Sequence, residues 1–95
     1  MDTYDIDQLG QLFSAVADPT RLRIILLVRE QSTRSSDIAH RLDMTASAIS
    51  HQLRWLRDRR IVKAEKKGRE TFYLLNDDCI AELLDVALKH IKEGD

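Results

Sequence analysis

The sequence predicts a mainly α-helical domain that carries one small β-hairpin. Hydrophobic residues recur at helical spacing over most of the 95 residues and make up 43% of the chain, as in ordinary globular proteins. After Arg60 the pattern changes to that of two short strands, which Lys67-Gly68-Arg69 joins. This length has room for one domain, which we take as residues 1–95.

The first two helices meet at a proline. Residues 5–17 form the first predicted helix, in which apolar side chains share one face. Asp18 is a good N-cap for the next helix, and Pro19 fits its first position, where no backbone N–H is needed. Residues 22–28 are apolar apart from Arg23, so we expect the second helix to be central and largely buried. The apolar face of the first helix consists of Ile6, Leu9, Leu12, Phe13 and Val16.

A pair of short helices follows a predicted turn at residues 31–33. The first helix of the pair spans roughly residues 35–42, the second spans residues 45–56, and about three residues connect them. Thr45 is the expected N-cap of the second helix. Two short helices with so short a connection are typical of a helix-turn-helix.

The second helix of this pair has two unlike faces. Ile49, Leu53 and Leu56 form an apolar stripe at helical spacing. The side chains off that stripe are short hydrogen-bonding groups and one cation, which suit contact with a polyanion whose edges carry donors and acceptors. An ordinary solvent-exposed helix rich in serine would show the same pattern. The residues off the stripe are Ser47, Ser50, His51 and Arg54.

Two strands with a basic tip follow the helix pair. Residues 61–66 and 70–75 have the composition of strands, and Gly68 supplies the positive φ of a short hairpin turn. A helix-turn-helix followed by a basic hairpin is a winged helix, whose wing would lie along the phosphate backbone beside the helix in the major groove. Lys67 and Arg69 are therefore candidate phosphate contacts.

The last predicted helix, residues 77–92, has an apolar face that is wide for the end of so small a domain. Apolar surface of this kind marks a contact with a partner, so we expect this helix to pack against a second subunit as well as its own core. The face consists of Ile80, Leu83, Leu84, Ala87, Leu88 and Ile91.

Charge is distributed unevenly along the chain, although the formal net charge is only −1. Residues 41–69 carry nine Lys or Arg and three Asp or Glu, whereas residues 1–18 carry four acids and no Lys or Arg. A basic middle between acidic ends is the pattern of a surface that binds nucleic acid. A solvated charge run is the alternative, and it is disfavoured because the positive charge coincides with the helix rich in Ser, His and Gln.

Composition disfavours several other classes of protein. Cys79 is the one cysteine, so no internal disulfide can form, which suits a reducing cytoplasm. The first twenty residues do not resemble a signal peptide, and no apolar run reaches the length of a membrane span. No catalytic motif indicates an enzyme, and none indicates a small organic substrate. The low aromatic content of 5% weighs against recognition of stacked bases.

Three motifs follow one another along the chain: Ala17-Asp18-Pro19-Thr20-Arg21-Leu22-Arg23-Ile24, Ser47-Ala48-Ile49-Ser50-His51-Gln52-Leu53-Arg54, and Gly68-Arg69 followed by Tyr73-Leu74. They resemble the ArsR/SmtB family of metal-sensing repressors, and the resemblance runs from about residue 9 to the end of the chain. It implies a winged-helix homodimer, joined through its first and last helices, that binds operator DNA and lets go when an inducer binds, usually a metal ion. The expected DNA-binding residues are Thr45, Ser47, Ser50, His51, Gln52, Arg54, Lys67 and Arg69.

The resemblance also implies where a metal sensor would lie. The cysteine-rich site that some members have in the third helix is absent, because residues 33–37 contain no cysteine. On the last helix, Asp77, Cys79, His90 and Glu93 match the spacing of the family's other site, with cysteine where the family usually has histidine. These ligands suit tetrahedral zinc, with nickel, cobalt and cadmium as alternatives.

This site would have to be shared between two subunits. Cys79 and His90 are separated by about 16 Å along one helix, whereas a transition metal lies only about 2.0–2.3 Å from its ligands. Two last helices packed antiparallel would bring Asp77 and Cys79 of one chain to His90 and Glu93 of its partner. Two-fold symmetry then gives two equivalent sites per dimer.

Two other functions stay open at this point. The same DNA-binding fold could respond to a thiol oxidant at Cys79 without sensing a metal. A winged helix could also serve only as a protein–protein module, which the basic segment at residues 41–69 disfavours.

Overall fold

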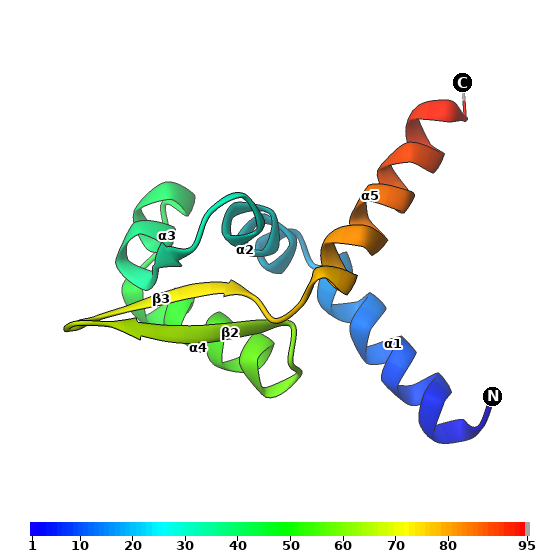
Figure 1. Cartoon of the computed structure of the whole chain (residues 1–95), viewed down its shortest axis with the longest axis horizontal. Coiled ribbons are helices and arrows are strands. Elements are labelled where there is room, and N and C mark those ends of the chain that lie inside the picture. The colour runs from blue at the N-terminus through cyan, green and yellow to red at the C-terminus, as the bar shows by residue number, and fades with distance from the viewer. Residues whose placement is uncertain (95) are drawn as a thin grey trace.

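The computed structural model describes residues 1–94, which form five helices and three strands (Figure 1). The predicted architecture, mainly α with a hairpin, is confirmed. In chain order the elements are α1 (Thr3–Ala17), α2 (Pro19–Glu30), β1 (Thr33–Arg34), α3 (Ser35–Leu42), α4 (Ala46–Asp58), β2 (Val62–Lys67), β3 (Glu70–Leu75) and α5 (Asp78–Glu93).

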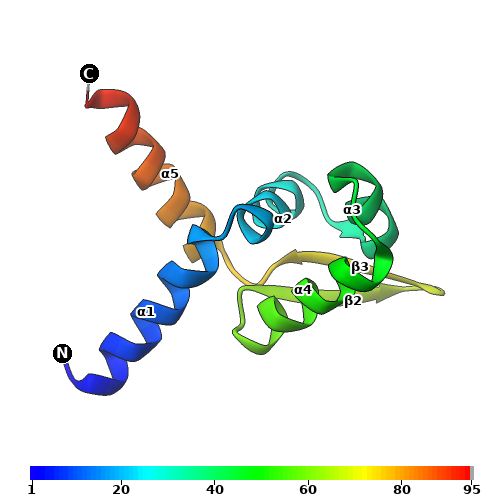
Figure 2. The same cartoon turned by 180° about the vertical axis from the view of Figure 1, so that it is seen from behind.

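The molecule divides into a helix–sheet body and two projecting helices. Helices α2, α3 and α4 pack beside the sheet, and the tip of the β2–β3 hairpin points away from the two termini (Figure 1). The view from behind agrees that α1 and α5 diverge from one region next to α2 (Figure 2). The hairpin and the two terminal helices therefore lie at opposite ends of the molecule.

Local capping interactions set the ends of the helices around the helix-turn-helix. Asp18 Oδ2 accepts a hydrogen bond from the backbone N–H of Arg21 at 2.9 Å, which starts α2 where the sequence predicts. Thr45 Oγ1 accepts a hydrogen bond from the N–H of Ala48 at 3.1 Å and starts α4. Asp43 adopts a left-handed conformation with φ of 54°, which ends α3 and forms the turn between the two helices.

The sheet has one strand more than the sequence predicts. Its order is β1-β3-β2 with antiparallel pairing throughout, so the expected hairpin is completed by a two-residue third strand. The prediction that residues 31–33 form only a turn is wrong at Thr33, which belongs to β1. Gly68 has the predicted positive φ, at 64°, in the turn between β2 and β3.

The core lies between α2, α3, α4 and the sheet. Helix α2 is central, as expected, and the apolar residues of its run are buried or half-buried except Leu26, which is 38% exposed. The largest fully buried side chains are Ile24, Ile25, Ile38, Ile49, Leu53, Leu56, Ile61 and Val62.

The apolar faces of α1 and α5 are only partly covered by the rest of the chain. Ala15 is the buried residue of α1, and Phe13 is 52% exposed. In α5, Ile80 is buried near the body and Ile91 is 66% exposed near the free end. Among the residues described, no helix has both the length and the hydrophobicity to cross a bilayer.

Candidate functional site

Helix α4 presents its polar face to solvent because its apolar stripe is fixed in the core. Ile49, Leu53 and Leu56 are buried against the body. The side chains predicted to contact DNA consequently lie outward: Ser47, Ser50, His51 and Arg54 are exposed, and Gln52 is half-buried. Thr45 is also exposed, although its hydroxyl oxygen serves as the N-cap.

A polar notch separates α4 from β3. It has a volume of about 420 Å³ and is lined by Ser50, Arg54, Arg57, Asp58 and Tyr73. Arg57 was not among the residues expected to bind DNA. Its spacing of three residues from Arg54 places both guanidinium groups on one side of α4, and this helical spacing is the signal that could have identified it.

The cations of α4 and the wing have no carboxylate partner within the described part of the chain. The ion pairs among residues 1–94 join Arg29 to Asp85 and Arg34 to both Asp37 and Glu70. Arg54, Arg57, Lys67 and Arg69 take no part in them and are exposed. Among residues 1–94, four cations without a carboxylate partner thus lie on α4 and at the tip of the wing, where Lys67 Nζ is 5.2 Å from the ring centroid of Phe72.

A cation–π cluster connects α1 to the C-terminal end of α4. Trp55 is half-buried, and the guanidinium carbons of Arg21 and Arg59 lie 3.9 Å and 3.7 Å from its ring centroid. Arg21 also donates hydrogen bonds of 3.4 Å to the carbonyl oxygens of Ser14 and Ala15 in the last turn of α1. These contacts fix the end of a projecting helix to the helix that carries the polar face.

The four metal-ligand candidates are exposed and lie at the two ends of α5. Asp77 and Cys79 are at its start, and His90 and Glu93 are in its last turn. Within residues 1–94 of a single chain, no three His, Cys, Asp or Glu side chains gather closely enough to hold a metal ion. Asp77 Oδ1 caps the helix by accepting the N–H of Cys79 at 3.0 Å.

The surroundings of Cys79 favour the neutral thiol. The negative charge of Asp77 raises the pKa of the Cys79 thiol, with smaller contributions from desolvation and from Glu82. The thiolate is the form that reacts with oxidants and binds metals. A high pKa therefore makes Cys79 less reactive toward oxidants in the free chain, whereas a bound cation would favour the thiolate.

Comparison with known proteins identifies the family. Residues 18–64 match the family described as bacterial regulatory protein, arsR family. The chain is 39% identical over 88 residues to a transcriptional repressor SmtB homolog of Synechocystis sp., covering 93% of this chain and 67% of that protein. It is 37% identical over 90 residues to the HTH-type transcriptional regulator NmtR of Mycobacterium tuberculosis, covering 95% of this chain and 75% of that protein.

A third relative and a solved structure agree with this assignment. A cadmium resistance transcriptional regulatory protein CadC homolog of Staphylococcus aureus is 30% identical over 86 residues, covering 90% of this chain and 71% of that protein. The solution structure of apo-NmtR matches with a TM-score of 0.82 and 35% sequence identity, covering 98% of this chain and 78% of that chain. The chain therefore belongs to the ArsR/SmtB family of bacterial regulatory proteins and is a winged helix-turn-helix transcriptional regulator.

Proposed function

We propose that this chain is a repressor that binds operator DNA as a homodimer and is released when a divalent metal, zinc above all, binds between two α5 helices. The observation that carries the DNA-binding part is the set of exposed, unpaired cations beside the hydrogen-bonding face of α4. Phosphates attract such cations without regard to sequence, and short polar side chains read base edges in the major groove.

The residues of the DNA face divide into two roles. Ser47, Ser50, His51 and Gln52, with Thr45 at the helix start, would lie near the bases. The cations would contact phosphates and set the register of the helix on the duplex. The phosphate contacts that we propose are Arg54, Arg57, Lys67 and Arg69.

The homodimer is supported by the uncovered apolar faces of α1 and α5. The face that Ile80 buries in the body continues along α5 to Leu88 and Ile91, which are 43% and 66% exposed. A second copy related by a two-fold axis would cover these side chains in both chains at once. The partner helix would then also supply the ligands that one chain lacks.

The donor set fits a metal shared between two chains. All four candidates are exposed and free of ion pairs among residues 1–94. Asp77 uses Oδ1 for the helix cap, and its Oδ2, which a metal would take, accepts a hydrogen bond of 3.4 Å from Asn76 Nδ2. Asp77 and Cys79 of one chain, with His90 and Glu93 of the other, give two carboxylates, a thiolate and an imidazole. This combination suits tetrahedral zinc, and nickel, cobalt or cadmium would compete for it.

Metal and DNA would oppose each other through the dimer. A metal that favours one arrangement of the two α5 helices changes the spacing of the two α4 helices, which must fit successive major grooves. Coupling of this kind is reciprocal, so DNA must weaken metal binding by the same factor as metal weakens DNA binding.

One titration tests this proposal. Zinc, nickel and cobalt are added to the wild-type protein bound to a duplex that it selects from a random pool, and the same is done with a His90→Ala variant. We expect metal to weaken DNA binding by the wild type by about 5- to 150-fold, the usual range of such coupling. The variant should bind DNA equally well without metal and respond little to its addition.

An equal metal response in the two proteins would rule out the α5 site. A response to peroxide but to no metal would instead support thiol sensing at Cys79, which the raised pKa of that thiol disfavours.

A further inference from the structure

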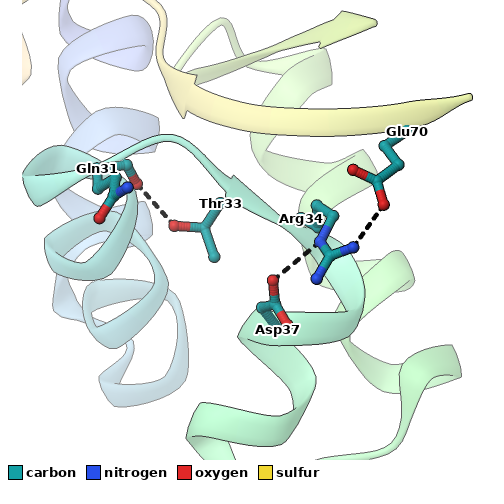
Figure 3. A network of polar contacts seen from close by, with 5 residues as sticks. All are labelled: Gln31, Thr33, Arg34, Asp37 and Glu70. Atoms are coloured by element: carbon teal, nitrogen blue, oxygen red, sulfur yellow. Dashed lines mark hydrogen bonds and ion pairs between the residues drawn. The ribbon is translucent and has the colours of Figure 1, made fainter. Parts of the chain in front are cut away.

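Arg34 joins three elements at the base of the wing. It is the last residue of β1 and directly precedes α3. Its Nε donates a hydrogen bond to Asp37 Oδ2 at 3.0 Å, and its Nη1 donates one to Glu70 Oε1 at 2.5 Å (Figure 3). We call Arg34, Asp37 and Glu70 the Arg34 bridge. It contains two of the three ion pairs found among residues 1–94.

The bridge reaches the part of the wing that β1 does not support. Arg34 pairs with Phe72 across the β1–β3 ladder, whereas the Lys67↔Glu70 pair at the wing tip has no third strand beside it. Residues 70 and 72 point to the same side of β3, and a diagonal neighbour is within reach of a long side chain. The Arg34 side chain therefore extends from the Arg34↔Phe72 pair, the last pair between β1 and β3, to Glu70, the first residue of β3 after the turn.

Glu70 is a carboxylate among the cations that we propose to bind DNA. Lys67 lies directly opposite it in the ladder, and Arg69 is its neighbour in the chain. Opposite charges on paired strands attract each other, so a free carboxylate at this position would pair with Lys67. It would also repel a nearby phosphate. Each effect would weaken the contact between the wing and DNA.

In the structure Glu70 is instead paired with Arg34. No ion pair within residues 1–94 involves Lys67 or Arg69. Asp37 contributes by holding Nε, which fixes the plane of the guanidinium group while Nη1 points to Glu70 (Figure 3). The pKa of Arg34 is raised, first by the hydrogen bond to Asp37 and next by that to Glu70, so the guanidinium group of Arg34 keeps its positive charge beside the two carboxylates.

We propose that Arg34 is a positioning residue for DNA binding, which holds Glu70 away from the wing cations and so keeps Lys67 and Arg69 free for phosphates. This inference rests on the proposed function, because it assigns a role within the same DNA interface. It predicts that loss of Arg34 is harmful mainly because Glu70 is then released.

The test measures the salt dependence of binding to the duplex selected by the wild-type protein. Arg34→Ala should weaken binding by about 3- to 10-fold and lower the salt slope of the homodimer by about two, since one wing cation in each subunit then pairs with Glu70 instead of a phosphate. Adding Glu70→Gln to Arg34→Ala should restore the wild-type slope, because the amide has no charge with which to hold a cation.

The matched control is Arg29→Ala, which also removes one arginine but breaks a single exposed ion pair, with Asp85 on α5, where Arg34→Ala breaks two. It should leave the salt slope unchanged. Circular dichroism checks that each variant is folded, and Arg34→Gln, which keeps a donor for Asp37, replaces Arg34→Ala if the alanine variant unfolds.

Two results would overturn the proposal. The first is an Arg34→Ala variant whose DNA binding depends on salt with the same slope as that of the wild-type protein. The second is a double variant that keeps the reduced slope of the single one, since Arg34 would then act only by holding the backbone. An absence of salt-dependent binding by the wild-type protein would refute the proposed DNA-binding function instead.

Discussion

Arg57 shows how a single side chain can extend a DNA-binding face beyond the residues that a motif suggests. It shares the notch between α4 and β3 with Arg54, Ser50 and Tyr73, and neither arginine has an ion-pair partner within residues 1–94. Two guanidinium groups beside hydroxyl donors suit a phosphate oxygen. The periodicity that identified Ser50 and Arg54 also includes Arg57, but only the position of β3 reveals that the three residues line one notch.

Replacement of Arg57 by alanine is expected to weaken DNA binding to all sequences alike. Removal of one phosphate contact from each subunit of the homodimer should lower the salt slope by about 1.8 and leave the preference for the selected duplex over a random one unchanged. Both quantities come from fluorescence anisotropy titrations at several salt concentrations. Arg23→Ala is the control, because Arg23 is an equally charged, exposed residue of α2 outside the notch. A slope change of the same size in both variants would mean that net charge alone is responsible.

At the scale of elements, the helices and the hairpin were predictable because their ends are set by short-range interactions. Asp18 and Thr45 cap their own helices three residues ahead, and Gly68 makes its turn with adjacent residues. Strand β1 was not predictable, since two residues are too few to show alternation and their partner β3 lies almost forty positions later. The bridge from Arg34 to Glu70 escaped prediction for the same reason.

The turn of the wing gives a test at this scale. Gly68→Ala should lower the free energy of unfolding by about 1 kcal/mol, because an added Cβ meets no atom within 4 Å but the φ of 64° is unfavourable for an L-residue. Gly10→Ala in α1 also places its Cβ in open space, and helix propensity should make that change neutral or stabilising by up to about 1 kcal/mol. Urea unfolding followed by circular dichroism measures both. Equal losses in the two variants would show that the positive φ of Gly68 does not decide the outcome.

At the scale of the whole molecule, the body and the projecting helices separate the two proposed tasks. The hairpin and the polar face of α4 belong to the body, whereas the metal-ligand candidates lie on α5, which extends away from the hairpin tip (Figures 1 and 2). The contacts of Arg21 with Trp55 and with the end of α1 join one projecting helix to α4, and the ion pair between Arg29 and Asp85 joins α5 to α2. Sequence spacing could identify the four ligand candidates on α5, but a site shared between subunits requires two chains, and one chain cannot bring its own ligands together.

The dimer interface yields the most direct test of this arrangement. Ile91 lies on the same face of α5 as Ile80, which is buried in the body, whereas Val86 lies on the opposite face. The two side chains are equally exposed in one chain, at 66% and 68%. Burial of an isoleucine side chain stabilises an interface by about 1.5–3 kcal/mol, and a two-fold dimer buries Ile91 of both subunits. Ile91→Lys should therefore raise the dissociation constant of the dimer by at least about 100-fold.

Val86→Lys introduces the same charge at a site of the same exposure and should leave the dimer intact. Sedimentation equilibrium measures the dimer in both variants, and the same proteins can be titrated with DNA. Because a monomer offers one α4 helix and one wing, Ile91→Lys should also reduce the salt slope of DNA binding to about half the wild-type value. If Val86→Lys dissociates the dimer and Ile91→Lys does not, the two subunits meet through the other face of α5, and the proposed role of the apolar face in the dimer is wrong.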